Sequence, residues 1–397
     1  MPSKIIPSRR TENVTYAVRD IVVLAQKTKE TGKEMLWLNI GDPLKYDFET
    51  PVHMIEAVSK AMREGHNGYS ASSGTDEAIA AIRKEAEKAK IGSIRDILIT
   101  NGGSEAIEIG LTSLLNPGDN ILTPNPGYPL YEAIINKLEA EENQYELDEE
   151  NGWQPDINDI ESKINDKTKG IVVINPNNPT GSVCHKDTLL QIIELARKHN
   201  LVIFSDEIYD KLIFDGKEYT SIASLADDVC FVTLNGLSKS YLVPGWRLGW
   251  AIISGPQELC GNYVEAYNKF TRARLCSNHP MQFAIKPALE GPQDHIAHAI
   301  QKLEKRRDIC MEILNSIDGI SCVSPEGAFY AFPRLERDLD DKEWVEGLIS
   351  ETGVVTVHGS GFGQKAGTHH FRIVLLPDEQ TLEKACLNIK EYMKKFS

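Results

Sequence analysis

The sequence predicts an α/β protein with a mainly parallel sheet, followed by a second and smaller α+β domain. Two observations carry this prediction. Short apolar runs alternate with helix-like segments from about residue 96, and the pattern changes after about residue 295. Strands that alternate with helices are typical of parallel sheets. In such sheets ligands bind beyond the carboxyl ends of the strands, so the polar residues that end each run are expected to meet in one crevice.

Apolar runs taken in order along the chain supply the strands of this sheet. They are preceded by a segment at 16–30 that is predicted to be a helix, because its apolar residues recur with helical spacing. Four strand-like runs follow, each ended by polar or glycine-rich residues: DILIT (96–100), NILTP (120–124), GIVVI (170–174) and LVIF (201–204). A helix is expected after most of them, including the segment SDEIYDKL after the fourth. Later runs at 228–234 and 248–253 are predicted as buried strands.

The pattern after residue 295 predicts the smaller domain. A helix rich in Lys and Glu is expected first, and strand-like pieces and a closing helix follow, at 298–316, 320–325, 328–333, 354–359, 371–376 and 380–396. We therefore expect three parts in the chain. They are an N-terminal arm that contributes to the small domain (1–48), a large ligand-binding domain (49–295) and the small C-terminal domain (296–397).

Composition narrows the possible function classes. The 397 residues carry a net charge of −15, which argues against nucleic acid as the main partner because phosphate backbones require a basic surface. The seven cysteines include no C-x-x-C pair, so neither a zinc ribbon nor a disulfide framework is expected. We expect neither a signal peptide nor a membrane span, because no apolar run is long enough. These features together predict a cytoplasmic globular protein.

The stretch NGLSKSYLVPGWRLGW (235–250) places two cations between the predicted strands at 228–234 and 248–253. Lys239 and Arg247 therefore lie where solvated surface charge is unusual, and this position favours the binding of an anion. A lysine held there can also act as a nucleophilic amine if burial or nearby charge removes its proton. Without other motifs, a solvated surface lysine would be the more frequent outcome.

Other motifs in the same order make the chain resemble the class I aminotransferases, the fold-type-I enzymes that use pyridoxal 5′-phosphate (PLP). The likeness rests on Ser-Lys with the later Gly-x-Arg, on NPNNPTG (175–181), on SDEIY (205–209) and on a distal arginine. It extends over nearly the whole chain, from 38–43 to 371–376. A narrower likeness, in IGDPLKYDF and HGSGFG, is to archaeal-type alanine aminotransferases. The resemblance implies the PLP-dependent transferase fold of type I, with PLP bound by the large domain.

The resemblance implies that Lys239 joins covalently to the aldehyde of PLP and that Ser238 and Arg247 bind its phosphate. Arginine suits this role because its fork of donors matches phosphate oxygens. The segment NGGSEAIE adds Gly103, where the backbone can approach a ligand closely, and Ser104, which opens a helix whose free N–H groups favour an anion. On its own, such a glycine-serine start would be an ordinary helix cap.

Asp206 is implied to pair with the pyridine nitrogen and to keep the ring protonated, so that the ring can accept electrons. Its alternative role is the N-cap of the helix expected next. Tyr209, expected one helical turn later on the same side, and Asn178 are implied to reach the phenolic oxygen of the cofactor. Core packing for Tyr209 and a turn before Pro179 for Asn178 are the alternatives. Lys239, Asp206 and Tyr209 form the expected catalytic set.

Two tyrosines are implied to contact the cofactor from different subunits. Tyr128 in NPGYPLYE corresponds to the aromatic residue that stacks on the ring, with Tyr131 as its rival. Tyr69 in GYSASSG resembles the tyrosine that reaches the phosphate of the neighbouring subunit. The resemblance therefore implies a homodimer with shared active sites.

The substrate is implied to bind through Arg372, which would clamp the α-carboxylate in a bidentate pair. The alternative is an outward-facing arginine on a half-buried strand. Gly41 and Asn178 are implied to contact the same substrate. A dicarboxylate such as 2-oxoglutarate requires a second cation in the pocket, for which Arg272 and Arg274 are equal candidates.

The implied reaction is a ping-pong transfer of an amino group from an L-amino acid, with alanine as the best guess, to 2-oxoglutarate. Aspartate, aromatic, branched-chain and diaminopimelate substrates stay open, as does a PLP-dependent carbon–sulfur lyase on the same fold. A transcription regulator with an aminotransferase-like domain is opposed by the acidic charge. No metal site is expected, because the adjacent His369 and His370 would point apart on a strand.

Overall fold

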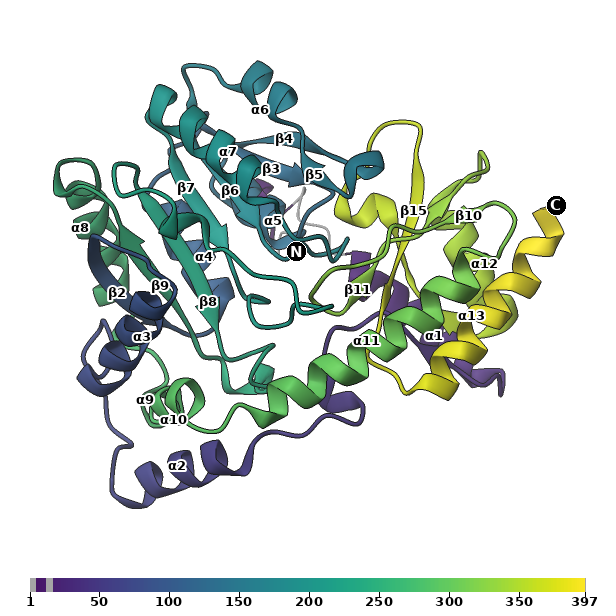
Figure 1. The fold of residues 1–397 in the computed structure, drawn as a ribbon, viewed down its shortest axis with the longest axis horizontal. Coiled ribbons are helices and arrows are strands. Elements are labelled where there is room, and N and C mark those ends of the chain that lie inside the picture. Colours follow the sequence, from purple (N-terminus) through teal and green to yellow (C-terminus); the bar gives the residue numbers. More distant parts are fainter. Residues whose placement is uncertain (1–4, 12–16, 397) are drawn as a thin grey trace.

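The structure, a computed structural model, describes residues 5–11 and 17–396 of the chain. Its largest element is a sheet in the order β2-β9-β8-β7-β6-β3-β4-β5, on the left in Figure 1. Five consecutive strands, from β8 to β4, run parallel, whereas β9 and β5 are antiparallel to their neighbours. The predicted mainly parallel α/β sheet is confirmed. The strands are β2 (Ile94–Thr100), β3 (Asn120–Asn125), β4 (Glu141–Asp148), β5 (Gln154–Pro155), β6 (Thr168–Ile174), β7 (Val202–Asp206), β8 (Phe231–Gly236) and β9 (Gly249–Ser254).

Helices cover both faces of this sheet, so its central strands are buried on both sides. Strands β3 and β9 are buried along their whole length, which explains their continuous apolar runs. One face packs on α4, α5 and α8, and the other on α2, α3, α6, α7 and α10. The helices of this part are α2 (Val52–Arg63), α3 (Asp76–Lys88), α4 (Gly103–Thr112), α5 (Leu130–Lys137), α6 (Ile157–Lys163), α7 (Lys186–His199), α8 (Gln257–Ala273), α9 (His279–Gln282) and α10 (Ile285–Glu290).

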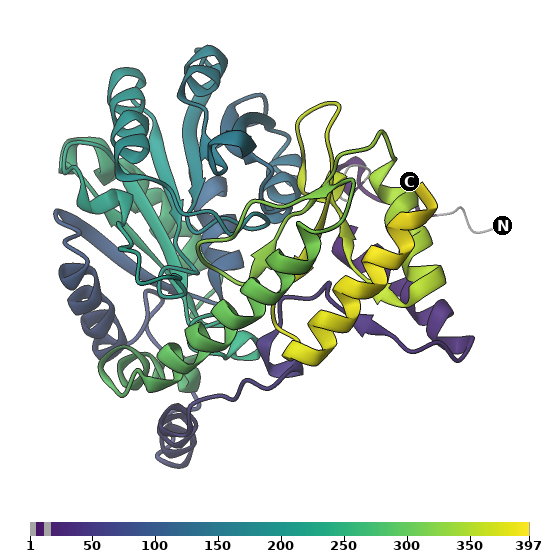
Figure 2. The same cartoon turned by 45° about the vertical axis from the view of Figure 1, so that its right-hand side comes forward.

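A second sheet of five short strands forms the other part of the molecule, on the right in Figure 1. Strand β15 lies at its centre and pairs antiparallel with β11, β12 and β14. The strands of this part are β1 (Leu36–Trp37), β10 (Ile320–Ser321), β11 (Tyr330–Ala331), β12 (Arg334–Leu335), β13 (Val354–Val355), β14 (Val357–His358) and β15 (His369–Val374). Its helices are α1 (Ala17–Glu30), α11 (Asp294–Leu314), α12 (Asp341–Thr352) and α13 (Glu379–Met393), and α11 and α13 lie side by side in Figures 1 and 2.

Short 3-10 helices complete the fold at the connections. They are η1 (Arg9–Thr11), η2 (Pro43–Lys45), η3 (Glu149–Asn151), η4 (Ile222–Ser224), η5 (Pro244–Trp246), η6 (Gly359–Phe362) and η7 (Lys394–Phe396). We call the part built on the eight-stranded sheet the large domain and the part built on the five-stranded sheet the small domain. Each has its own apolar core.

Helix α11 contributes to the cores of both domains. Ile296 near its start packs in the core of the large domain, whereas Ala299 and Leu303, about one and two turns later, pack in that of the small domain. The N-terminal arm also belongs to the small core, because Ile21 and Leu38 are buried there. The boundaries at 48/49 and 295/296 stay a prediction.

Two sequence predictions about individual elements are wrong. The segment after β7 forms hydrogen-bonded turns rather than a helix. A helix there would be incompatible with the β-bridge between Ile213 and Gly327, which joins this segment to the small domain. The run at 354–359 is two strands rather than one. Its first half, β13, pairs with β1, and its second half, β14, pairs with β15.

Candidate active site

A cavity of about 630 Å³ lies between the two domains, beyond the carboxyl ends of the parallel strands. Loops after β3, β6, β7 and β8, the start of α4 and residues of the small domain enclose it. Every residue predicted to bind the cofactor or the substrate α-carboxylate, except Tyr69, lines it. The lining residues are Val22, Ile40, Gly41, Asp42, Lys45, Gly103, Ser104, Ile107, Tyr128, Ile174, Asn178, Asp206, Ile208, Tyr209, Ser238, Lys239, Pro244, Arg247, Tyr330, Phe362 and Arg372.

Lys239 follows strand β8 and presents its amine inside this cavity. Its Nζ donates a hydrogen bond to the backbone oxygen of Gly41 at 2.9 Å. The pKa of Lys239 is lowered to about 8, chiefly by burial; the cations Arg372 and Arg247 act in the same direction, and the carboxylates of Asp42 and Asp206 oppose them. A neutral amine is therefore much more accessible near neutral pH than for a solvated lysine, as a nucleophile or general base requires.

Asp206 is the last residue of β7 and is only 6 % exposed. Its Oδ2 accepts a hydrogen bond from the hydroxyl of Tyr131 at 3.2 Å, and its Oδ1 accepts from the backbone N–H of Ile208 at 3.4 Å. Burial raises the pKa of Asp206 to about 6, although both hydrogen bonds and the charge of Lys239 act in the opposite direction. The carboxylate is therefore mostly ionised at pH 7, buried and next to the cavity.

The start of helix α4 and Arg247 form a group of donors at the cavity wall. No side chain caps this ten-residue helix, so its first N–H groups remain available to an anion. Nη1 and Nη2 of Arg247 donate to the backbone oxygens of Pro244 at 2.9 Å and Asn101 at 3.3 Å, which hold the guanidinium in place.

A glycine that the sequence analysis did not select is required at this wall. Gly102 has a φ of 87°, and a Cβ there would collide with the guanidinium of Arg247. The predicted Gly103 lines the cavity, and a Cβ there would meet nothing within 4 Å. Gly103 therefore leaves space for a ligand, whereas Gly102 provides the close approach between the two chain segments.

The two candidate aromatic residues after β3 have different positions. Tyr128 lines the cavity, whereas Tyr131 is buried and bonds Asp206. Their rings meet edge to face, with centroids 6.5 Å apart. Tyr128 is therefore the one that can present a ring face to a ligand, and Tyr131 supports the carboxylate instead.

Arg372 lies on β15 of the small domain and is only 3 % exposed, so it does not face outward. Its Nη1 donates to Oδ1 of Asn178 at 3.0 Å, and its Nη2 donates to the backbone oxygen of Asn39 at 2.7 Å. The guanidinium lies over the rings of Tyr330 and Phe362, at 4.6 and 4.3 Å from their centroids. A fixed fork of donors at the cavity wall is suited to a carboxylate.

Tyr209 lies in the turn after β7, and its hydroxyl is 2.8 Å from that of Tyr330. Burial raises the pKa of the Tyr209 phenol well above its usual range. The hydroxyl therefore stays protonated and can donate a hydrogen bond into the cavity. Its contact with the cofactor stays a prediction.

Three residues singled out in the sequence lie outside the cavity. Tyr69 is 82 % exposed. Arg272 pairs with Glu265 at 2.9 Å on the surface, and Arg274 pairs with Glu105 at 3.2 Å and donates to a backbone oxygen. Neither arginine therefore supplies a second cation to the cavity of its own chain. Lys45, which the sequence analysis did not select, lines the cavity instead.

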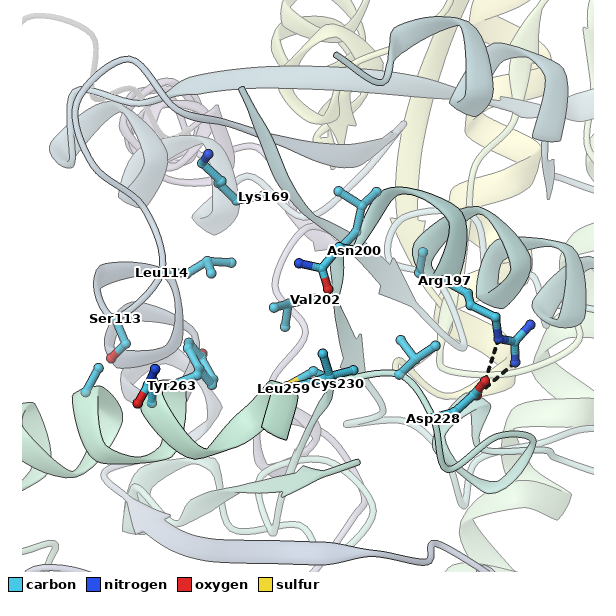
Figure 3. Close-up of a pocket in the computed structure, with 15 residues that line it drawn as sticks. Ser113, Leu114, Lys169, Arg197, Asn200, Val202, Asp228, Cys230, Leu259 and Tyr263 are labelled. Atoms are coloured by element: carbon cyan, nitrogen blue, oxygen red, sulfur yellow. Dashed lines mark hydrogen bonds and ion pairs between the residues drawn. The ribbon is translucent and has the colours of Figure 1, made fainter. Parts of the chain in front are cut away.

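Another cavity, of about 410 Å³, lies where the parallel strands begin (Figure 3). Lys169, Asn200 and Val202 line it, and Arg197 is held there by an ion pair with Asp228. It contains none of the predicted site residues, and parallel sheets bind ligands at the other ends of their strands. The cavity between the domains is therefore the candidate active site.

Within the described ranges, no group of three or more His, Cys, Asp or Glu side chains is placed to hold a metal ion. In the same part of the chain, no helix combines the length and apolar character needed to cross a bilayer.

The donors around the cavity fit PLP in kind and arrangement. The uncapped start of α4 with Ser238 and Arg247 can hold a phosphate, and Lys239 offers an amine to an aldehyde. Asp206 offers a buried carboxylate to a pyridine nitrogen. The volume lies in the range of cavities that enclose a cofactor or small ligand.

Comparison with known proteins relates nearly the whole chain to enzymes of one family, the aminotransferases. The profile of class I and II aminotransferases matches residues 33–389. Glutamate-pyruvate aminotransferase AlaA of Escherichia coli strain K12 is 40 % identical over 96 % of both chains, and alanine aminotransferase of Mycobacterium bovis is 39 % identical over 97 % of this chain and 92 % of its own. The structure of alanine aminotransferase from Pyrococcus furiosus superposes with a TM-score of 0.94, is 42 % identical, and covers 98 % of this chain and 100 % of its own. The chain belongs to the class I and II aminotransferases and is a PLP-dependent transaminase of fold type I.

Proposed function

We propose that this enzyme exchanges amino groups between L-alanine and 2-oxoglutarate, and in reverse between L-glutamate and pyruvate. The observation that carries the proposal is that one cavity contains both an amine of lowered pKa, Lys239, and a fixed guanidinium, Arg372. The substrate pair is supported by the names of the relatives, which are glutamate-pyruvate and alanine aminotransferases.

In this proposal Arg372 and Asn178 hold the α-carboxylate of the amino acid. The two side chains are already joined by a hydrogen bond, so they receive the substrate as one unit. Binding at this wall would bring the substrate Cα to the Lys239 amine, which would take its proton and then deliver it to the cofactor carbon. PLP, when bound, supplies an electron sink that stabilises the negative charge left on that carbon.

Other residues would hold the cofactor while Lys239 moves the proton. Ser238, Arg247 and the start of α4 would bind its phosphate, and Asp206 would hold its ring nitrogen. Tyr128 would cover one face of the ring. These roles are supported by the shared cavity and by the donor type at each position.

A dicarboxylate substrate needs a cation in addition to Arg372. Lys239 and Arg247 serve the cofactor, so among the described cations that line the cavity Lys45 remains. Its side chain is exposed at the end of η2, next to Asp42 at the cavity wall. We therefore assign the side-chain carboxylate of glutamate and 2-oxoglutarate to Lys45.

We further propose that the enzyme is a homodimer in which Tyr69 reaches the phosphate site of the partner subunit. The exposure of this tyrosine supports the proposal, because an aromatic ring left open to water gains by being covered. Tyr69→Phe, studied for its effect on PLP affinity in a protein whose mass has been measured in solution, would test both parts. A monomer that retains full PLP affinity would contradict them.

The test of the function is an absorption titration of the PLP-loaded protein. We expect L-alanine alone to remove the visible band of the cofactor, and 2-oxoglutarate to restore it. Loss of the band with aspartate or tyrosine but not with alanine would keep the reaction and overturn the substrate. Continuous release of pyruvate and ammonia from an amino acid, with no oxo acid added, would instead identify a lyase.

A further inference from the structure

His370 lies two residues before Arg372 on strand β15, so both side chains project from the same face of the strand. That face points toward the large domain, and His370 is only 1 % exposed. The neighbouring His369 projects the other way and lies 3.7 Å from the fully exposed Asp338. The two adjacent histidines therefore have different environments, and only His370 shares the surroundings of the substrate arginine.

The imidazole of His370 bridges the two domains. Its Nε2 lies 3.3 Å from Oε2 of Glu149, which is in η3, directly after strand β4 of the large domain. Arg334, the register partner of His370 on β12, places its Nη1 3.3 Å from the same carboxylate oxygen. One carboxylate of the large domain thus contacts two side chains from adjacent strands of the small domain.

Both nitrogens of the ring face acceptors. Nδ1 lies 3.1 Å from Oε1 of Gln364, and the amide nitrogen of Gln364 donates to Asp341 at 3.2 Å, which fixes the orientation of the amide. Nε2 therefore lies within hydrogen-bond distance of Glu149 across the domain boundary, and Nδ1 lies within hydrogen-bond distance of Gln364 in the small domain. The apolar ring of Trp153, 5.5 Å from the imidazole, limits its access to water.

A continuous row of aromatic rings connects the contact between His370 and Glu149 to the substrate arginine. The imidazole of His370 stacks on Phe332, with centroids 4.7 Å apart and planes 2° from parallel. Phe332 meets Phe362 edge to face at 6.3 Å, and Phe362 lies under the guanidinium of Arg372 at 4.3 Å. The backbone oxygen of Phe362 accepts from the N–H of Gly127 at 2.8 Å, in the loop that carries Tyr128.

We propose that His370 and Glu149 form an interdomain clasp that positions Arg372 for the α-carboxylate of the substrate. This contact fixes β15 and the ring of Phe362 against the large domain, so that the guanidinium stays aligned with Asn178. The inference rests on the proposed role of Arg372. His370 is a positioning residue, since it lies outside the residues that line the cavity.

The test compares three single variants and one control. His370→Phe keeps a ring that can stack on Phe332 but removes both ring nitrogens, and Glu149→Ala removes the partner. Arg372→Lys tests the clamp itself. His369→Phe is the matched control, because it changes the adjacent histidine without touching Glu149. KM and kcat for L-alanine are measured for each PLP-loaded protein at saturating 2-oxoglutarate.

We expect His370→Phe and Glu149→Ala each to raise the KM for alanine about tenfold with kcat changed by less than about threefold, because the contact network tunes carboxylate binding rather than proton transfer. A double variant that combines His370→Phe with Glu149→Ala should lose no more than the worse single variant, since both changes remove the same contact. His369→Phe should leave KM unchanged, and Arg372→Lys should raise it about a hundredfold.

The possible failures point to different conclusions. If Arg372→Lys raises KM while His370→Phe and Glu149→Ala do not, the clasp is overturned and the proposed function stands. If Arg372→Lys itself leaves KM unchanged, the role of Arg372 fails and the clasp fails with it. If His370→Phe does not fold, the result for Glu149→Ala alone tests the clasp. An equal loss in kcat and kcat/KM for Glu149→Ala would also overturn the positioning role.

Discussion

The hydroxyl of Tyr131, on helix α5, donates a hydrogen bond to the Asp206 carboxylate at the end of β7, across 3.2 Å. This bond opposes the effect of burial on the pKa of Asp206, which is raised to about 6. We expect Tyr131→Phe to raise that pKa further and to lower kcat/KM at pH 7 by roughly tenfold, the usual value of a hydrogen bond to a charged group.

The measurement for Tyr131→Phe is the pH profile of kcat/KM. Its acid limb should move to higher pH, because a larger fraction of Asp206 is protonated at a given pH. Tyr145→Phe is the control, since that buried hydroxyl donates to the backbone oxygen of Val172 instead. An acid limb that does not move would show that Tyr131 does not control the carboxylate.

Asp206 should lower the stability of the PLP-free protein above pH 6. Its folded pKa, about 6, is raised above the ordinary value of 3.8, so its contribution to stability is fully present below pH 3.8 and is lost as pH rises through 6. Asp206→Asn should therefore increase the free energy of unfolding at pH 8 by roughly 2 kcal/mol, while abolishing most activity. Denaturant unfolding of both PLP-free proteins at pH 4.5 and 8 tests this, and the difference should shrink at pH 4.5.

Lys239 should capture PLP with a pH dependence of its own. Because its pKa is lowered to about 8, the neutral amine becomes abundant at much lower pH than in a solvated lysine. We expect the rate of covalent PLP capture by the PLP-free protein to rise through about pH 8 and then to level off. Absorbance after mixing, from pH 6 to 10.5, measures it. A midpoint near 10 would contradict the buried amine, and Lys239→Ala should show no covalent capture at any pH.

Gly102 should be intolerant of any side chain. Its φ of 87° and its contact with Arg247 mean that Gly102→Ala both strains the backbone and displaces the guanidinium. We expect a loss of stability of about 1–3 kcal/mol and an affinity for PLP at least tenfold lower. Gly92→Ala is the control, because a Cβ there meets nothing and its backbone needs no positive φ. Equilibrium PLP binding to both proteins would reveal the difference, and equal affinities would contradict it.

Lys45 should discriminate between the two oxo acids. Lys45→Ala should raise the KM for 2-oxoglutarate roughly tenfold and leave that for pyruvate within about twofold, because only the first carries a second carboxylate. Lys167→Ala removes a charge far from the cavity and serves as the control. Equal changes in KM for both oxo acids would show that Lys45 does not bind the second carboxylate.

Most of the cavity could be predicted because its residues sit where strands end. Asp206 ends strand β7 and Lys239 lies three residues after the end of β8, so the fold class alone places them at one edge of the sheet. The ion pair that holds Arg274 away from the cavity gave no such signal, because it depends on Glu105, far along the chain. The same limit applies to Lys45, whose place in the cavity depends on how the N-terminal arm crosses the large domain.

Tyr131 and Gly102 show a second kind of limit. The role of Tyr131 depends on how α5 lies over the sheet, which brings its hydroxyl to Asp206, whereas Tyr128 in the preceding loop lines the cavity. The need for Gly102 comes from the guanidinium of Arg247, 145 positions later in the chain. Spacing within one segment cannot show either contact. The prediction of a helix after β7 was wrong for the same reason, since the β-bridge between Ile213 and Gly327 joins residues of different domains.

Helix α11 supplies side chains to both cores, with Ile296 in one and Leu303 in the other. Neither core can therefore melt and leave the other whole unless this continuous helix breaks near its first turns. On heating, the PLP-free protein should accordingly give one calorimetric unfolding peak rather than two. The same helix makes the active site inseparable from the whole polypeptide: a fragment cut between its first and third turns would leave the amine on one piece and the guanidinium on the other.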